Sequence, residues 1–293
     1  MILKSSNKIK TYKRRHKAVA WAVHGFTTSG IVLGFLGLIA VFEGKQELAF
    51  IFMGLALLVD GIDGTLARLA KVSQLTPQFD GASLDNVVDM FNYSVLPALM
   101  IYWFEMVPEK YAIFTSASIM AVSCYTFADN SMKTSDYYFK GFAAFWNILV
   151  LYFFILETSQ TVNLIIIAIC CILTFLPIKI IHPLRVKSLR QISIPMTVLW
   201  GASAFGLINQ RINLEDDGTF ATLIFSIWIF STIYFLLICL LIFLSAFLEL
   251  FSAFLFLANT SLLRLGSNLL KCFTSGAPAQ TNASSLETLF IGP

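Results

Sequence analysis

Four aspartates lie close together in two segments that are otherwise mostly apolar. Asp60 and Asp63 are three residues apart in the first segment, and Asp85 and Asp89 are four apart in the second. Residues at these spacings share one face of an α-helix. The linker between the segments contains Pro77 and is short enough to make the two helices antiparallel neighbours. The spacing therefore predicts that two carboxylates from each helix converge.

Carboxylates in such a setting need cations. A charged side chain at the centre of a membrane helix costs about 2.5–3.5 kcal/mol on insertion scales, and like charges repel strongly at low dielectric. Ion pairing for helix packing cannot neutralise four aspartates, because Arg68 is their one obvious basic partner. Ligation by carboxylates without His or Cys suits hard ions. We therefore expect two divalent ions, Mn²⁺ or Mg²⁺, on the four aspartates.

Small residues accompany the carboxylates. Gly64 and Ala67 each follow an aspartate by four residues, and Gly81 precedes Asp85 by four. These positions leave clearance for a flat or bulky ligand near the backbone, and the guanidinium of Arg68 is suited to binding phosphate. A metal-ion transporter is the alternative from a different functional class. Transport sites usually lie near the bilayer midplane, whereas this cluster is expected at the inner ends of its helices.

Composition places these segments in a membrane. Apolar residues make up 57% of the 293 residues and charged residues 13%, whereas soluble domains carry about a quarter charged residues. Runs of ~20 apolar residues can cross the bilayer as helices, and the short alternating strands of a barrel are not seen. The fold class is thus an all-α integral membrane protein, a polytopic helical bundle. About eight transmembrane helices are expected, at 18–42, 46–69, 82–104, 110–129, 142–157, 162–181, 192–209 and 219–242.

Charge distribution predicts the orientation. Eight spans put both termini on one side, and Lys and Arg concentrate in 1–17 and in the other segments on that side, whereas the opposite loops are acidic. By the positive-inside rule both termini and the carboxylate site face the cytoplasm. The basic residues cluster at helix ends, which gives no support for nucleic-acid binding.

The regions outside the spans differ in character. Residues 1–17 form a basic cytoplasmic segment ahead of the membrane domain at 18–242. Residues 243–275 stay apolar and are expected to form either an interfacial helix or a further span, with Glu249 favouring the interface. Residues 276–293 are small and polar, and their end resembles an imperfect picornaviral protease site. We interpret them as an expression-tag remnant.

The aspartate segments resemble the CDP-alcohol phosphotransferase family, whose motif is D-x-x-D-G-x-x-A-R, a spacer, then G-x-x-x-D-x-x-x-D. The eight fixed positions are matched by Asp60, Asp63, Gly64, Ala67, Arg68, Gly81, Asp85 and Asp89. The twelve-residue spacer 69–80 is longer than the common form. In this spacer, in the run 20–27 and in the eight-span layout, the sequence is similar to the bacterial phosphatidylcholine synthase branch.

The resemblance implies a reaction and a site. Choline would attack the β-phosphate of CDP-diacylglycerol and release CMP and phosphatidylcholine, in the inner membrane of a bacterium. It implies a six-helix family core, so that two of the eight spans would be additions, and a homodimer. The implied metal ligands are Asp60, Asp63, Asp85 and Asp89, with Asp89 also the catalytic base; the implied CDP-binding residues are Gly64, Ala67, Arg68 and Gly81. Sister enzymes that use serine, inositol or glycerol phosphate share this motif, so the acceptor stays open.

Further contacts are assigned at the level of single residues. Thr27 is a candidate for the nucleotide pocket, and His24 is interpreted as a structural histidine. A quaternary ammonium cannot donate a conventional hydrogen bond and favours aromatic faces. The candidates for choline binding are Tyr93, Asn92, Tyr125, Trp146 and Trp21, all expected near the inner surface. Tyr and Trp are also common at membrane interfaces for other reasons.

Overall fold

The structure, a computed structural model, describes residues 2–129, 138–176, 179–181, 189–213 and 218–241. The described residues up to 240 form one compact unit. The segments 243–275 and 276–293, expected as an apolar C-terminal segment and a tag remnant, lie outside the described residues.

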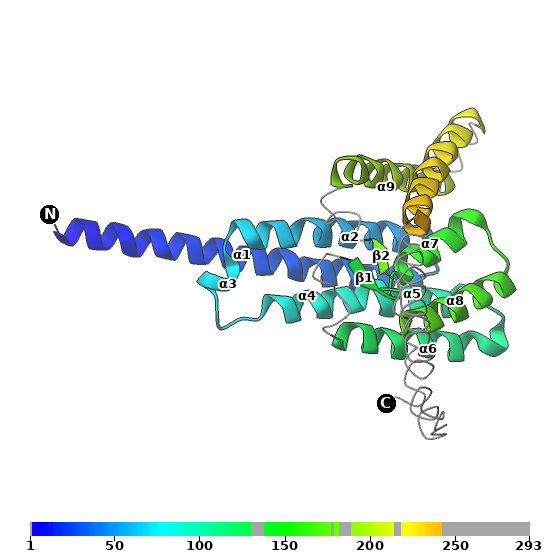
Figure 1. Cartoon of the computed structure of the whole chain (residues 1–293), viewed down its shortest axis with the longest axis horizontal. Coiled ribbons are helices and arrows are strands. Elements are labelled where there is room, and N and C mark those ends of the chain that lie inside the picture. Colours follow the sequence, from blue (N-terminus) through cyan, green and yellow to red (C-terminus); the bar gives the residue numbers. More distant parts are fainter. Residues whose placement is uncertain (1, 130–137, 177–178, 182–188, 214–217, 242–293) are drawn as a thin grey trace, which may run out of the picture. The chain divides into compact units, whose positions relative to one another are not determined.

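Helices make up nearly all of the described unit (Figure 1). The long ones are α1 (Ile2–Phe42), α2 (Gln46–Leu69), α6 (Glu109–Ala128), α9 (Arg190–Asn213) and the helix Gly218–Leu241. The third expected span is a continuous helical run of α4 (Gly81–Met90), the π-helical segment η1 (Phe91–Val95) and α5 (Leu96–Trp103). The shorter helices are α3 (Val72–Leu75), α7 (Trp146–Leu156) and α8 (Gln160–Thr174).

Each of the eight expected spans corresponds to a helical segment. Among the described residues, five helices are long and apolar enough to cross a membrane, and α7 and α8 are shorter apolar helices. The expected class, a polytopic helical membrane protein, is confirmed. The first helix begins at Ile2 rather than near residue 18, so the basic segment and the first span belong to one helix.

The expected helical boundaries are wrong at the start of 142–157 and at the end of 162–181. α7 begins only at Trp146 and α8 ends at Thr174. A short strand β1 (Tyr138–Lys140) before α7 pairs antiparallel with β2 (Lys179–Ile181) after α8. Gly141 adopts a φ of +72° and packs against the end of α8, where an added Cβ would lie 2.4 Å from the Thr174 carbonyl oxygen. The apolar run at the end of 162–181 concealed this strand, because short apolar runs do not distinguish strand from helix.

A row of glycines on α1 lets the third span approach closely. An added Cβ would lie 2.9 Å from Val88 Cγ1 at Gly30, and 2.2 Å from Asn92 Oδ1 at Gly34. Small residues allow the backbones of membrane helices to come together in this way. The contact fixes α4 and η1, which carry half of the expected site, against α1.

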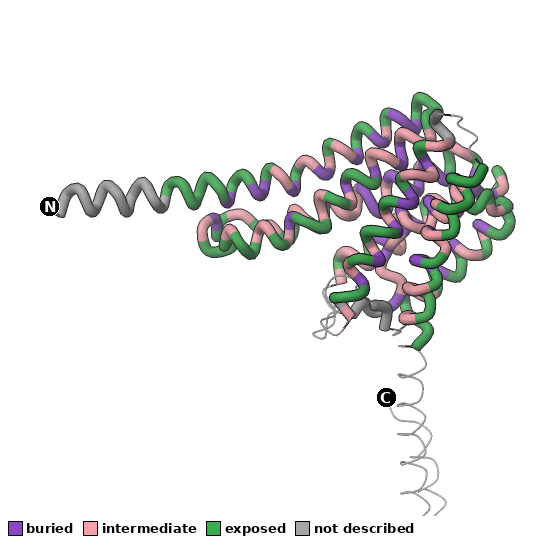
Figure 2. Tube along the Cα trace, turned by 90° about the horizontal axis from the view of Figure 1, so that it is seen from above, coloured by how far each residue is buried: buried purple, intermediate pink, exposed green. Residues whose placement is uncertain are grey.

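The buried residues lie where these helices meet (Figure 2). The main core contains Phe50 of α2, Leu96 of α5 and Trp146 of α7, each at most 2% exposed. A separate small cluster joins Ala20 and Val23 of α1 to Val72 of α3. The linker between α2 and α4 is thereby docked on α1 rather than free.

Candidate active site

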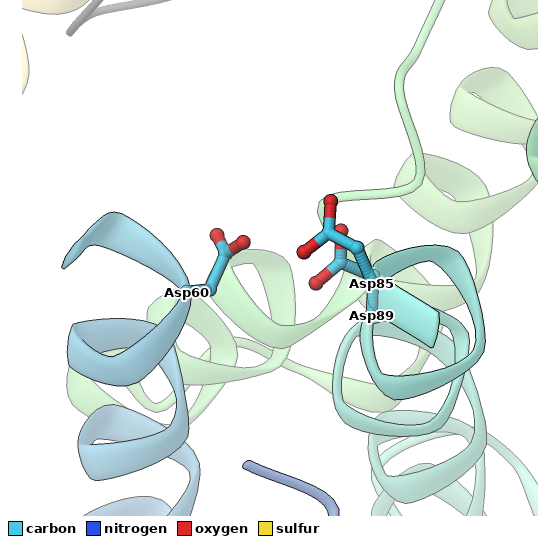
Figure 3. Close-up of side chains that lie close together, drawn as sticks. All are labelled: Asp60, Asp85 and Asp89. Atoms are coloured by element: carbon cyan, nitrogen blue, oxygen red, sulfur yellow. The ribbon is translucent and has the colours of Figure 1, made fainter. Parts of the chain in front are cut away.

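The structure brings together three of the four predicted aspartates. Asp60 projects from α2 toward Asp85 and Asp89 on the facing side of α4 (Figure 3). One carboxylate oxygen from each of the three lies within 4.8 Å of the others. All three are partly buried. Carboxylates from the two helices therefore do converge, but with one from α2 and two from α4 rather than the predicted two from each.

Asp63 occupies a different position in the same site. It is only 5% exposed and lines the same cavity as Asp60 and Asp89. Within the described residues it is not part of the group whose oxygens lie within 4.8 Å of one another. Its assignment as a fourth metal ligand therefore stays a prediction.

The cavity lies among α1, α2, α4 and η1. Its empty space, including the part open to solvent, is about 220 Å³. It is lined by Thr27, Ala56, Val59, Asp60, Asp63, Val88, Asp89, Asn92 and Tyr93. Thr27, predicted as a nucleotide contact, is thus at the carboxylates, and so are the choline candidates Asn92 and Tyr93.

Tyr93 contacts the carboxylate cluster directly. Its hydroxyl donates a hydrogen bond of 2.5 Å to Asp60 Oδ2. The residue lies in η1, which adds a π-helical turn just after Asp89, and such turns often occur at functional sites. The sequence suggested the aromatic face of Tyr93 as a choline contact, and it did not predict the role of the hydroxyl.

The side chain of Asn92 makes hydrogen bonds that hold two helical segments together. Its side-chain amide donates to the carbonyl oxygens of Gly30 and Val88, at 3.1 and 3.0 Å. Its Oδ1 is buried beside Gly34 and accepts no hydrogen bond from any of the described residues. The amide therefore joins η1 to α1, next to the cavity that it lines.

Gly81 contacts a histidine rather than open space. An added Cβ there would lie 3.1 Å from His24 Cε1. His24 Nε2 lies 3.1 Å from Thr76 Oγ1, whose hydroxyl donates to the Val72 carbonyl oxygen; His24 Nε2 is therefore the donor in this pair. His24 is thus a satisfied structural histidine, and the smallness of Gly81 serves helix packing as well as any ligand clearance.

The remaining motif residues lie on the C-terminal part of α2. Arg68 is exposed, and its guanidinium donates to Thr65 Oγ1 at 2.9 Å. An added Cβ at Gly64 would lie 3.5 Å from Arg68 Nη1, so the guanidinium passes over this glycine. Ala67 packs against the small cluster of α1 and α3. Arg68 is the motif residue that remains accessible to a phosphate.

The other three choline candidates do not line the cavity. Trp146 is fully buried in the core, and its indole donates to Ser123 Oγ at 2.9 Å. Tyr125 is half exposed, with its ring 5.1 Å from that of Phe175. Trp21 lies beside His24 and Phe79, with ring centroids 5.5 and 5.4 Å away.

The donor set fits a hard divalent cation. The three clustered residues offer only carboxylate oxygens, the ligands preferred by Mg²⁺ and Mn²⁺. Cys170 and Cys171 lie instead on α8, which supplies no residue to the cavity. The carboxylates therefore match a site for Mg²⁺ or Mn²⁺ better than a zinc site.

Carboxylates that converge from two neighbouring helices of a membrane protein suit a metal-dependent membrane enzyme or a cation carrier. Comparison with known proteins decides between these. The sequence matches the CDP-alcohol phosphatidyltransferase family over residues 23–176, and the chain belongs to this family. The family uses divalent metals, and the matched range contains the whole aspartate cluster.

Individual relatives agree. The chain is 36% identical to a phosphatidylcholine synthase from Pseudomonas aeruginosa over 225 residues, covering 77% of this chain and 92% of that protein. It is 41% identical to one from Borreliella burgdorferi, covering 62% and 77%. It is 39% identical to one from Rhizobium johnstonii, covering 71% and 86%.

Proposed function

We propose that the protein transfers a phosphatidyl group from CDP-diacylglycerol to choline, giving phosphatidylcholine and CMP. The convergence of Asp60 with Asp85 and Asp89 beside a cavity is the observation that carries this proposal. Choline as the acceptor is supported by the relatives, which are phosphatidylcholine synthases.

The carboxylates would allow the site to bind a pyrophosphate by holding divalent cations. Asp60, Asp85 and Asp89, with Asp63 as the fourth ligand, would hold two divalent ions, Mn²⁺ or Mg²⁺. Bound there, the ions neutralise charge on the pyrophosphate and on the departing CMP. Arg68 is exposed in the last turn of α2, where it is available to bind a phosphate of the CDP group by charge-assisted hydrogen bonds. The other proposed nucleotide contacts are Gly64, Ala67, Gly81 and Thr27.

Asp89 is the proposed base. It lines the cavity and is one of the clustered carboxylates. As the choline oxygen forms its bond to the β-phosphorus, the bond from that phosphorus to the oxygen of CMP breaks. The choline proton passes to Asp89, and CMP leaves with the bonding electron pair. Positioning and charge neutralisation supply most of the catalysis in reactions of this type.

The ring of Tyr93 is the best-supported choline contact. It is 7% exposed and lines the cavity, and an aromatic face suits a quaternary ammonium. Asn92 shares the cavity, although its amide is engaged with backbone carbonyls. Trp21, Tyr125 and Trp146 lie outside the cavity lining and have no such support.

We further propose that the protein lies in a bacterial inner membrane as a homodimer, with its site facing the cytoplasm. The orientation is supported by the charge distribution. The dimer is supported by the resemblance to a family whose members are usually homodimers. Choline would then reach the site from the cytosol while the acyl chains of the lipid stay in the bilayer.

One assay tests the reaction. The purified protein is incubated with CDP-diacylglycerol, Mn²⁺ and choline, serine, inositol or glycerol phosphate in turn, and CMP release is measured. CMP release that depends on choline and stops when the metal is chelated is expected. Release with another alcohol instead would identify a sister transferase, and no release with any alcohol would contradict the enzymatic function.

A further inference from the structure

The hydroxyl of Tyr93 connects the two halves of the carboxylate cluster. Tyr93 lies in the same helical run as Asp85 and Asp89, whereas the oxygen that accepts its hydrogen bond belongs to Asp60 on α2. Within the described part of the chain, this is the one hydrogen bond that the Asp60 carboxylate accepts. The orientation of Asp60 toward the other two carboxylates therefore depends on this contact.

The donor itself is held firmly. Tyr93 is 7% exposed, and its neighbour Asn92 is fixed by hydrogen bonds to Gly30 and Val88. The close packing of Gly34 against Asn92 and Phe91 leaves η1 little room to shift. The phenol is thus positioned by the bundle before any ligand arrives.

We propose that Tyr93 is a positioning residue, whose hydroxyl holds the Asp60 carboxylate in the orientation that the divalent cation needs. This inference rests on the proposed function, in which Asp60 is a metal ligand. An ionised carboxylate has about four acceptor sites, so one bond from Tyr93 to Oδ2 leaves the other oxygen and further lone pairs for a cation. Hydrogen bonds of this kind orient metal ligands, and removing them typically weakens metal affinity by about 10–100-fold.

The two proposed roles of Tyr93, one for its hydroxyl and one for its ring, predict different effects of Tyr93→Phe. Tyr93→Phe removes the hydroxyl but keeps the aromatic face and the packing. If the residue served only as an aromatic surface for choline, this change would leave metal binding unaltered. If the hydroxyl positions Asp60, metal binding weakens while the choline KM at saturating Mn²⁺ stays the same.

The experiment uses the full chain in detergent. Mn²⁺ binding is measured by isothermal titration calorimetry without substrates, and CMP release is measured over a range of Mn²⁺ concentrations. For Tyr93→Phe we expect a dissociation constant for Mn²⁺ raised about tenfold and a matching rise in the Mn²⁺ concentration that gives half-maximal activity.

Tyr152→Phe is the matched control. The Tyr152 hydroxyl is likewise partly buried and hydrogen-bonded, to Thr232 and Trp200, and it does not line the cavity. This variant should bind Mn²⁺ like the wild type. Equal Mn²⁺ affinity in wild type and Tyr93→Phe would overturn the positioning role alone, as would equal weakening in both Tyr variants. Failure of the wild type to bind Mn²⁺ would overturn the assignment of Asp60 as a metal ligand and the positioning role with it, whereas absence of CMP release with any alcohol would overturn the proposed function.

Discussion

At the scale of single residues, the clustered carboxylates come from two helices, Asp60 from α2 and Asp85 and Asp89 from α4. Asp85 and Asp89 lie on one face of the same helix, and Asp60 reaches them from across the cavity with the help of Tyr93. All three are proposed metal ligands, and the residue that serves as the base must in addition approach the choline hydroxyl. Asp89, which lines the cavity, is the carboxylate to test as the base.

Replacing Asp89 by Asn should stop turnover and spare lipid binding. The amide keeps the size of the side chain but cannot accept the choline proton, so we expect CMP release to fall by about 10²–10⁴-fold, the usual contribution of a general base. CDP-diacylglycerol binding to the purified variant, measured by calorimetry, should stay within a few fold of the wild type.

Asp80→Asn is the control for that variant. Asp80 caps the start of α4 and does not line the cavity, and Asn is an equally good cap. It should retain activity. Loss of CDP-diacylglycerol binding in Asp89→Asn would show that Asp89 acts chiefly as a metal ligand.

Individual contacts show how far the site could be predicted from the sequence. The grouping of Asp60 with Asp85 and Asp89 follows from helical periodicity and a short linker, both of which are local properties. The hydrogen bond between Tyr93 and Asp60 joins residues 33 apart, and its geometry depends on the π-helical turn in η1. No spacing rule reveals that turn. The contact of Gly81 with His24 was hidden in the same way, since it depends on how the linker docks on α1.

At the scale of elements, the glycine row on α1 is the feature that sets the position of the third span. Gly34 makes the closest approach, because an added Cβ would lie 2.2 Å from Asn92 Oδ1 and 2.8 Å from Phe91 Cδ1. We expect Gly34→Ala to force η1 away from α1 and to destabilise the protein by about 1–3 kcal/mol, as overpacking commonly does. Thermal unfolding in detergent measures the change.

Gly54→Ala provides the comparison. Gly54 lies on α2, and an added Cβ there would meet no atom within 4 Å. The Gly54→Ala variant should therefore have a melting temperature equal to or slightly above that of the wild type, because Ala is more stable than Gly in the middle of a helix. Equal melting of Gly34→Ala and Gly54→Ala would mean that α1 and η1 can separate without cost.

The beginning of α4 should make a pH-dependent contribution to stability. Hydrogen bonds from the Ser83 hydroxyl, and from the backbone N–H groups of Ser83 and Ala82, lower the pKa of Asp80 below its ordinary value of 3.8. A pKa that is lower in the folded state stabilises the fold above the ordinary value, and the contribution is lost as the pH falls below it.

Asp80→Ala should therefore melt below the wild type at neutral pH, and the difference should shrink as the pH is lowered through 3.8. Asp80→Asn keeps a neutral cap. The difference in melting temperature between Asp80→Asn and Asp80→Ala should therefore vary little with pH. Melting curves from pH 7 to pH 3 test this. A constant difference between wild type and Asp80→Ala over that range would contradict it.

Element boundaries were predictable where one apolar helix spans the bilayer without interruption. The expected span 46–69 coincides with α2, and 110–129 lies within one residue of α6 (Glu109–Ala128). The prediction failed around β1 and β2, because their pairing joins residues about 40 positions apart. Hydrophobic periodicity reflects only local burial, so it cannot predict a pairing between strands that are far apart in the sequence.

At the scale of the whole molecule, the carboxylate cluster has a defined side of the membrane. Asp60 lies in the second half of α2, and Asp85 and Asp89 lie in the first half of the run from α4 to α5. The linker between them, residues 70–80, is therefore on the same side as the site. The loop between α1 and α2, which contains Lys45, is on the other side.

Chemical labelling can determine which side is cytoplasmic. In a variant whose five cysteines are replaced by Ser and which keeps its activity, single cysteines are introduced by Lys45→Cys or Ser73→Cys, both at exposed positions. Basic residues concentrate on the side of Ser73, so the positive-inside rule places it in the cytoplasm. In intact bacterial spheroplasts, a maleimide that cannot cross the membrane should label Lys45→Cys at once and Ser73→Cys only after permeabilisation. The opposite pattern would put the carboxylates on the outer face, where cytosolic choline could not reach them, and would refute the proposed orientation while leaving the fold unchanged.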